Sequence, residues 1–446
     1  MRHLLLSISF LFSAGFSFAQ VSGQYGNGSK APDHHYDFQI PERTELNYDE
    51  SNVPDYSLSD PLTGNDGTRI TTVKQWEKQR RAEIFELFSS QMYGRTPKEK
   101  LKVTYETLSE NSGFLNGKAT AKQVKFIFTN GQKKHEAVLL LVLPNRPKGK
   151  VPVFAGYNFM GNHSTIADTI ILFSPYYSLP VTADNTEQQT ERTERGRQSN
   201  RWPYELIIDR GYGIATMSYQ DIYPDDTDME DHSIVSLFSD YDPDSRAPDR
   251  WKALGAWAWG LSRIVDYLET QKRVDMNKII TMGHSRQGKA SLWAGAQDKR
   301  FKIVISNNSG CAGAALSKRV YGESIARILR ISHWFCPTLS RYANNEAGMP
   351  FDQHELVALI APRKVYIASA VDDLGADPKG EFLSGYHAGP VYELYGLKGL
   401  GTDKQPPLNR PVMHDMGYHV REGGHDVTDY DWMRFMDFAD KHFGRK

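Results

Sequence analysis

The chain has 446 residues, of which 39% are hydrophobic and 24% charged, a balance typical of a globular protein with one large domain or two. Its net charge of -1 indicates neither a nucleic-acid nor a polyanion partner. The long apolar run at the N-terminus has no counterpart further along, so no membrane association is expected once that run is removed.

The N-terminus has the features of a secretory signal peptide. A short basic start is followed by an apolar stretch over residues 4–16 and by Ser17-Phe18-Ala19, with small residues where a signal peptidase reads. We therefore expect residues 1–19 to be removed after Ala19 and the protein to be secreted or periplasmic. Residues 20–65 are rich in Gly, Ser, Asn, Asp and Pro and predict an N-terminal extension, which leaves residues 66–446 as the catalytic domain.

Beyond the extension, helical and strand-like patterns alternate. Apolar spacing predicts helices over residues 76–92, 203–209, 252–270 and 289–296, and strands over residues 122–128, 137–143, 151–157, 212–219, 278–282, 301–306 and 363–369. The polar residues 174–202 predict a surface insertion. This alternation predicts an α/β fold with a mostly parallel sheet covered on both faces, whose chemistry lies beyond the carboxyl ends of the strands.

A six-residue motif, Gly283-His284-Ser285-Arg286-Gln287-Gly288, connects the predicted strand 278–282 to the predicted helix 289–296. A strand, a sharp turn and a helix are the setting of a nucleophile elbow, in which small flanking residues leave the serine hydroxyl exposed above the sheet. The spacing after the serine is one residue longer than in Gly-x-Ser-x-Gly. The motif predicts Ser285 as a nucleophile, and a glycine-rich packing turn is the alternative.

A serine nucleophile needs a base and an orienting carboxylate, which in α/β-hydrolases follow it in the order acid, then histidine. Among the seven histidines after Ser285, His425 is the best candidate, because the two glycines before it let a late loop curl back over the elbow. Asp372 and Asp373 both follow the predicted strand 363–369, and spacing does not choose between them.

An oxyanion hole needs donors aimed at the place where negative charge develops. The backbone N–H of Arg286 is one candidate, and the glycine-framed loop over residues 156–163 is another. The guanidinium of Arg286 is a third candidate, with a structural salt bridge as its alternative role. The sequence leaves open whether Cys311 and Cys336 form a disulfide or remain buried thiols, and it has no cysteine or histidine cluster with zinc-binding spacing.

These motifs resemble those of the glucuronoyl esterases, carbohydrate esterase family 15. The resemblance spans about residues 150–435 and rests on the core motif at 283–289 and on five further segments at residues 256–263, 309–315, 333–336, 376–382 and 423–426. It implies a three-layer α/β/α hydrolase sandwich that uses no metal or cofactor. It also implies cleavage of the ester between (4-O-methyl)-glucuronate on xylan and an alcohol of lignin.

The same resemblance implies roles for single residues. Ser285 would be the nucleophile, His425 the base and Arg286 an oxyanion donor. Lys289, one helical turn after the serine, would bind sugar hydroxyls, and Glu323 would be a further sugar contact.

The chain departs from the family pattern at three places, and the first and third of these departures resemble bacterial rather than fungal members. Asn308 stands where fungal relatives carry the acidic residue, so the resemblance implies that Asp373, after the later strand, is the acid. Gly375 stands where a substrate-stacking tryptophan is usual. His284 and Asp426 stand where fungal cysteines tie the serine and histidine loops together.

The resulting hypothesis is a serine esterase that acts, as a monomer, on glucuronoxylan and lignin–carbohydrate esters. An acetyl xylan esterase or a general carboxylester hydrolase is the alternative enzyme. A secreted carbohydrate-binding protein with a decayed triad is the non-enzymatic alternative.

Overall fold

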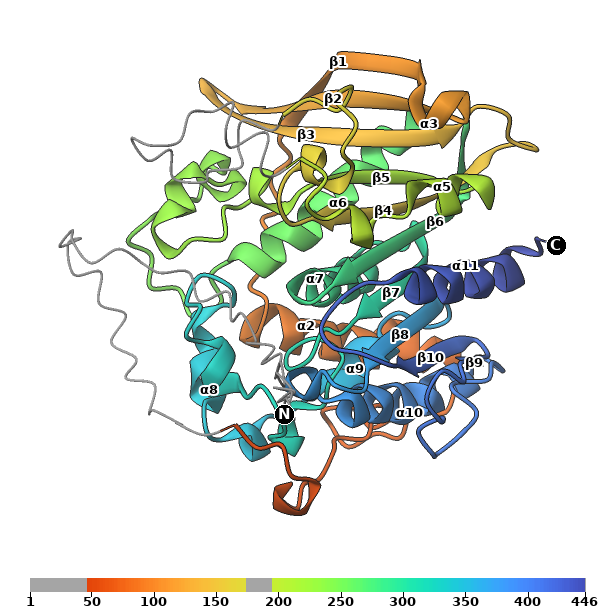
Figure 1. The fold of residues 1–446 in the computed structure, drawn as a ribbon. Helices are drawn as coiled ribbons and strands as arrows, with labels where there is room; N and C mark the ends of the chain where they lie inside the picture. Colours follow the sequence, from red (N-terminus) through yellow and green to blue (C-terminus); the bar gives the residue numbers. More distant parts are fainter. Residues whose placement is uncertain (1–45, 174–194, 446) are drawn as a thin grey trace, which may run out of the picture. The chain divides into compact units, whose positions relative to one another are not determined.

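The computed structural model describes residues 46–173 and 195–445, all within one compact unit (Figure 1). The predicted signal peptide, most of the predicted surface insertion and residues 20–45 of the predicted extension lie outside this part of the chain. In the described ranges no helix is long and apolar enough to cross a membrane.

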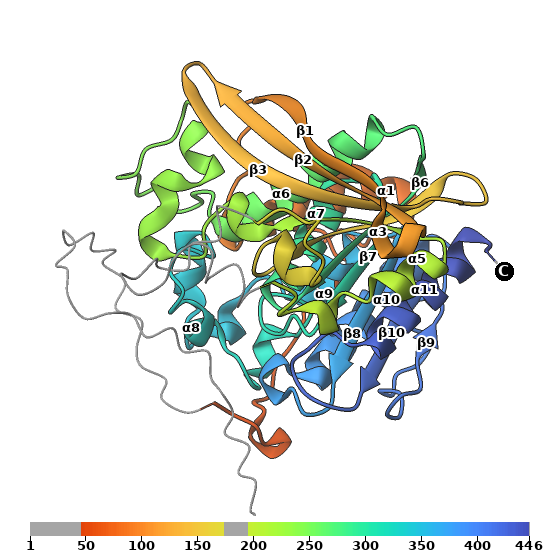
Figure 2. The same cartoon turned by 45° about the horizontal axis from the view of Figure 1, so that its top comes forward.

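One sheet organises the fold. Its strands are β1 (Lys102–Gly113), β2 (Ala119–Asn130), β3 (Lys133–Pro144), β4 (Val151–Asn158), β5 (Gly213–Ser218), β6 (Val274–His284), β7 (Phe301–Asn307), β8 (Lys364–Ala370), β9 (Val412–Met413) and β10 (Met416–Arg421). The spatial order is β1-β2-β3-β5-β4-β6-β7-β8-β10-β9. The six central strands, β5-β4-β6-β7-β8-β10, are parallel to one another. Strands β1, β2 and β3 form an antiparallel ribbon at one edge (Figure 2), and β9 lies at the other edge, antiparallel to β10.

The helices pack on both faces of this sheet. They are α1 (Val73–Gln75), α2 (Arg81–Gln91), α3 (Phe114–Gly117), α5 (Tyr204–Asp209), α6 (Ala253–Glu269), α7 (Arg286–Gln297), α8 (Ile325–Ile328), α9 (Gln353–Ala358), α10 (Pro378–Leu394) and α11 (Asp429–Phe443). The predicted helix 76–92 is found as a wide π turn over Trp76–Arg80 that continues into α2. The predicted helix 289–296 begins earlier, at Arg286, because the elbow leads directly into it.

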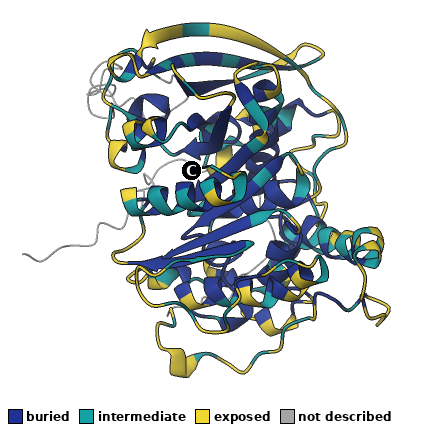
Figure 3. Ribbon diagram, turned by 90° about the vertical axis from the view of Figure 1, so that its right-hand side faces the viewer, coloured by how far each residue is buried: buried dark blue, intermediate teal, exposed yellow. Residues whose placement is uncertain are grey.

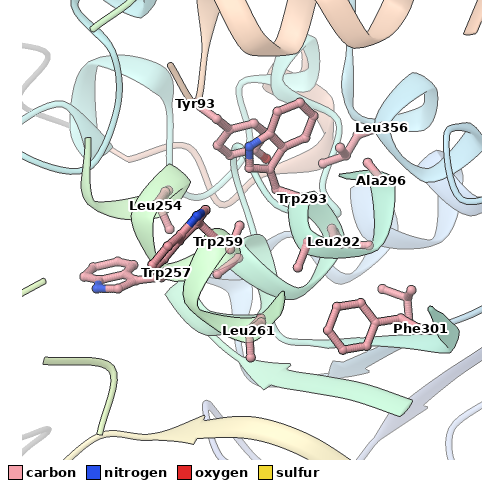
Figure 4. Packing of buried hydrophobic residues seen from close by; sticks show 14 of the residues in the cluster. Tyr93, Leu254, Trp257, Trp259, Leu261, Leu292, Trp293, Ala296, Phe301 and Leu356 are labelled. Carbon is pink, nitrogen blue, oxygen red and sulfur yellow. The ribbon is translucent and has the colours of Figure 1, made fainter. Parts of the chain in front are cut away.

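Two hydrophobic clusters separate the three layers. Because side chains alternate along a strand, Val153 and Ala155 of β4 face a cluster shared with α2, α6, α7, α9 and α10, whereas Phe154 faces a cluster shared with α5 and α11. In the larger cluster the rings of Tyr93 and Trp293 stack with centroids 4.9 Å apart (Figure 4). The central strands are almost entirely buried between the layers (Figure 3). The expected three-layer α/β/α sandwich is thereby confirmed.

The sheet order determines where the chemistry can lie. Strands β6, β7, β8 and β10 are successive parallel neighbours, so the residues that follow them meet at one edge of the sheet. Ser285 follows β6, Asn308 follows β7, Asp373 follows β8 and His425 follows β10. Cys311 is buried near this edge as a free thiol, and Cys336 is likewise free, so the two cysteines do not form a disulfide.

Candidate active site

Ser285 occupies a strained turn between β6 and α7. Its φ of 57° and ψ of -130° lie outside the regions that residues with side chains usually adopt. The flanking glycines are required here, because a Cβ on Gly283 would lie 1.9 Å from the carbonyl oxygen of Gln287, and one on Gly288 would lie 2.9 Å from Cβ of Ser309. The turn is held by a 2.9 Å hydrogen bond from Ser285 N–H to the carbonyl of Asn307. This is the geometry of a nucleophile elbow.

Asp373 is the aspartate that contacts the predicted base. The Nδ1–H of His425 donates a 2.6 Å hydrogen bond to Asp373 Oδ2, which leaves Nε2 of the neutral imidazole free of a proton. The neighbouring Asp372 is exposed to solvent instead. The two loops are joined by backbone hydrogen bonds from Val371 N–H to the carbonyl of Arg421 and from Asp372 N–H to that of Gly423, at 2.8 and 3.1 Å.

Asn308 gives the carboxylate a second donor. It adopts a left-handed conformation with φ of 45°, which asparagine tolerates better than most residues. Its backbone N–H donates to the carbonyl of Ala368 at 2.7 Å, and its side-chain Nδ2 donates to Asp373 Oδ2 at 2.8 Å. The departure at position 308 therefore places a hydrogen-bond donor beside the carboxylate.

His284 lies between the serine turn and the His425 loop. Its ring centroid is 4.4 Å from that of His425, and its Nδ1 is 2.6 Å from Oδ1 of Asn307. Burial and the neighbouring His425 hold the pKa of His284 well below its usual value, so its imidazole stays neutral. In the described part of the chain no hydrogen bond joins His425 to Ser285. Such catalytic hydrogen bonds often form only when substrate is bound.

The loop that carries His425 is fixed from beneath by a buried arginine. Arg421 is only 3% exposed and donates to the backbone carbonyls of Glu422, Gly424 and Asp426 at 2.8, 3.2 and 2.5 Å. Its Nε also donates to Asp431 Oδ2 at 2.7 Å.

Asp431 connects Arg421, and with it the His425 loop, to the residues around the serine turn. Its Oδ1 accepts hydrogen bonds from Asn307 Nδ2 at 3.2 Å and His419 Nε2 at 3.0 Å. Since Asn307 also contacts His284, buried polar contacts link the histidine loop to the serine turn. Asp426, at the second position where fungal members carry a cysteine, instead forms a 2.6 Å ion pair with Arg201.

The guanidinium of Arg286, the residue after the serine, is held by Asp225. The two groups form an ion pair, and the Arg286 Cζ lies 4.7 Å from the ring centroid of Trp334. Asp225 also accepts hydrogen bonds from His333 Nε2 at 2.8 Å and Trp334 Nε1 at 2.7 Å. Burial alone would raise the pKa of Asp225, but the hydrogen bond from His333 and the charge of Arg286 hold it well below the usual value. The alternative role of Arg286, a structural salt bridge, is therefore present in the structure.

Lys289 and Glu323, the two predicted sugar contacts, lie close to each other. The Nζ of Lys289 is 3.7 Å from Glu323 Oε2 and donates to the backbone carbonyls of Ser309 and Cys311. The Lys289 side chain is 3% exposed, whereas that of Glu323 is 41% exposed. Glu323 is thus the more accessible of the two predicted sugar contacts.

A buried carboxyl, Glu381, supports the loop that carries Asn308. It accepts hydrogen bonds from the N–H groups of Ser309 and Gly310 at 2.7 and 3.1 Å and from the hydroxyl of Ser369 at 2.6 Å. Burial raises the pKa of Glu381 to about 8, although the hydrogen bonds from Ser369 and Gly310 lower it.

The fold and this site define the protein as an α/β-hydrolase. Over residues 206–396 the chain matches the family model described as glucuronyl esterase, fungi. It is 43% identical to Carbohydrate esterase MZ0003 from an unknown prokaryotic organism, over 89% of this chain and 92% of that protein. A promiscuous CE15 esterase from a marine bacterial metagenome has a similar structure, with a TM-score of 0.81 and 41% identity over 89% of this chain and 100% of that one. So does a glucuronoyl esterase from Solibacter usitatus, with a TM-score of 0.81 and 40% identity over 88% of this chain and 100% of that one.

The chain therefore belongs to carbohydrate esterase family 15, the family of glucuronoyl esterases, and is of its bacterial type. This confirms the resemblance inferred from the sequence motifs.

Several polar residues around the site had no role in the sequence hypothesis, namely Asp225, Asn307, Glu381, Arg421 and Asp431. A local sequence pattern does mark Asp431, because Thr428 and Asp431, three residues apart, form a capping box at the start of α11. Asp225 lies in an acidic run that is typical of a solvated loop. Nothing in the local pattern distinguishes Arg421 from an arginine at the exposed end of a strand.

Proposed function

We propose that this protein is a serine esterase that hydrolyses the ester between (4-O-methyl)-glucuronate on xylan and the alcohols of lignin. The observation that carries the proposal is the hydrogen bond between His425 and Asp373 at the edge of the sheet where the strained Ser285 stands. Membership of a family of glucuronoyl esterases supports the choice of substrate.

In the proposed mechanism Ser285 Oγ attacks the uronate carbonyl carbon while His425 Nε2 takes the hydroxyl proton. Asp373 accepts from Nδ1 and stabilises the imidazolium that forms. The backbone N–H of Arg286, together with its fixed positive charge, stabilises the tetrahedral oxyanion. The C–O bond to the alcohol then breaks, and the alcohol leaves with the proton from His425. Water, activated by the same imidazole, hydrolyses the glucuronoyl-enzyme and restores the serine hydroxyl.

Lys289 and Glu323 are proposed to hold the sugar ring. Lys289 Nζ donates to two backbone carbonyls, and an ammonium has a third N–H for a sugar hydroxyl. The half-exposed carboxylate of Glu323 can accept from a second hydroxyl. These charged groups should also discriminate against substrates without the matching hydroxyls, because a buried charge would then lack a hydrogen-bond partner.

The test is a kinetic comparison of benzyl esters of glucuronate and galacturonate with acetylated xylan. We expect the glucuronate ester to have the highest kcat/KM. A preference for acetyl groups, or the absence of turnover on any uronate ester, would contradict the proposal.

A general carboxylester hydrolase is the second candidate, and Gly375 favours it. Within the described ranges, the one atom within 4 Å of a Cβ added at this position is Asp373 Oδ1, at 3.8 Å, so there is space beside the predicted acid. The structural relative from the marine metagenome is described as promiscuous. Comparable kcat/KM values on 4-nitrophenyl acetate and on benzyl glucuronate would support this broader activity.

We also propose that the protein is exported after cleavage at Ala19 and acts as a monomer. N-terminal sequencing of exported protein should begin at Gln20, and light scattering should give the mass of one chain. An uncleaved N-terminus or a stable dimer would contradict these two points.

A further inference from the structure

The first described residues form a short arm against the segment that carries Glu323. Gly322 N–H donates to the carbonyl of Asn47 at 2.7 Å, and Tyr321 Oη donates to the carbonyl of Tyr48 at 3.1 Å. The rings of Tyr48 and Tyr321 meet edge to face with centroids 6.4 Å apart. The arm, drawn in red at the start of the coloured chain, approaches the region of α8 (Figure 1). Tyr48 is therefore held by the chain immediately before a predicted sugar contact.

This segment in turn packs directly on the loop that follows Asp373. Glu323 N–H donates to the carbonyl of Gly375 at 2.9 Å. Gly322 has φ of 61°, and a Cβ there would lie 2.4 Å from the carbonyl oxygen of Leu374 and 2.5 Å from that of Gly375. The two backbones touch without side chains between them. The Glu323 segment therefore lies between the arm and the Asp373 loop, at one rim of the site.

Tyr48 presents an aromatic surface at this rim. It is 48% exposed, and Leu374, whose backbone carbonyl lies against Gly322, is 40% exposed. Burial and the charge of Glu323 raise the pKa of Tyr48, whereas the charge of Arg327 lowers it. Arg327 lies in α8, four residues after Glu323; its side chain is exposed, and no described residue forms an ion pair with it. We call Tyr48, Leu374, Arg327 and Glu323 the Tyr48 rim.

We propose that the Tyr48 rim is a glycan subsite that binds the xylan sugars next to the esterified glucuronate. This inference rests on the proposed function. A pyranose ring has apolar C–H faces and a hydroxyl edge, and the rim offers an exposed aromatic ring and an apolar side chain beside a guanidinium and a carboxylate. The two charged groups, the Arg327 guanidinium and the Glu323 carboxylate, favour a hydroxyl-rich glycan over the aryl ring of a lignin alcohol. The subsite also gives the predicted N-terminal extension a role in substrate selection.

The experiment compares two benzyl esters, one of free glucuronate and one of glucuronate carried on a xylo-oligosaccharide. Tyr48→Ala should lower kcat/KM for the oligosaccharide ester roughly fivefold, mainly through KM, because stacking on one exposed ring is worth on the order of 1 kcal/mol. The small ester should change less than about twofold. Tyr48→Trp, which keeps an aromatic face, should retain oligosaccharide activity. Tyr386→Ala removes another exposed tyrosine, 41% accessible, from α10 and should change neither substrate.

The outcomes separate the subsite from the proposed function. If the wild type hydrolyses neither ester, the proposed function fails and the subsite fails with it. If the wild type hydrolyses both and Tyr48→Ala changes both equally or neither, only the subsite is overturned. A Tyr48→Ala variant that selectively loses its preference for benzyl over methyl esters of free glucuronate would place Tyr48 on the alcohol side and would likewise overturn it.

Discussion

The side chain of Asn308 donates a 2.8 Å hydrogen bond to the same oxygen of Asp373 that accepts from His425. Replacement by aspartate would put a second carboxylate where this donor stands. Because nearby negative charge favours the protonated imidazole, the acidic limb of the pH–rate profile of Asn308→Asp should move to higher pH by roughly 1 unit. The measurement is kcat/KM for benzyl glucuronate between pH 4 and 9. An acidic limb at the wild-type position would show that position 308 does not act on the histidine.

The two neighbouring aspartates should differ sharply in their effect on catalysis. Asp373→Asn removes the charge that orients and stabilises the imidazole, so kcat should fall by about 10²–10⁴. Asp372→Asn is a matched control, because its side chain is exposed, and it should stay within about twofold of the wild type. Equal losses in the two variants would contradict the assignment of the acid.

Arg421 should act as a positioning residue for the His425 loop. Lysine keeps the positive charge opposite Asp431 but cannot reproduce the planar fork that reaches three backbone carbonyls. Arg421→Lys should lower kcat at least about tenfold and slow the labelling of Ser285 by a fluorophosphonate, measured well below the unfolding temperature.

The control for this variant is Arg434→Lys, which alters a more exposed ion pair with Asp437 on α11. It should leave both rates unchanged. If Arg421→Lys loses only thermal stability and labels Ser285 at the wild-type rate, its role is structural.

Glu381 should make stability depend on pH. Burial raises its pKa from 4.5 in the unfolded chain to about 8 in the native state, so the native state keeps a proton that the unfolded state loses. The free energy of unfolding contributed by this group is therefore highest below pH 4.5 and falls as the pH rises towards 8.

Glu381→Gln cannot ionise and should lack this dependence. Relative to wild type, its free energy of unfolding in urea should rise by at least about 1 kcal/mol between pH 5 and pH 8. A constant difference between the two proteins over that range would mean that Glu381 is ionised in the native state.

Much of the sheet could be predicted from the sequence, because its central strands are buried on both faces and appear as continuous apolar runs. Strand β1 was missed, since it lies at an edge and is mostly exposed, with a polar sequence that resembles a loop. Strand β10 is absent from the predicted strands. Its position next to β8 depends on a long-range crossover that local patterns do not encode.

The site was predictable to the extent that its residues follow strands. Ser285 and the Asp372–Asp373 pair were located by their positions after predicted strands, and His425 by the two glycines before it. The sheet brings the three loops to one edge. The choice between Asp372 and Asp373 by residue pattern was impossible, because it depends on which side chain turns towards His425. The contacts of Asp225, Arg421 and Asp431 join segments far apart in the chain, so they too required the structure.

The central claim is that Ser285 is the nucleophile of a uronate esterase, and turnover of benzyl glucuronate by Ser285→Ala tests it most directly. The account predicts that kcat falls by several orders of magnitude, with about 10⁶ as the upper guide from other serine triads, while the variant keeps its fold and still binds glucuronate. Turnover within tenfold of the wild type would contradict the account.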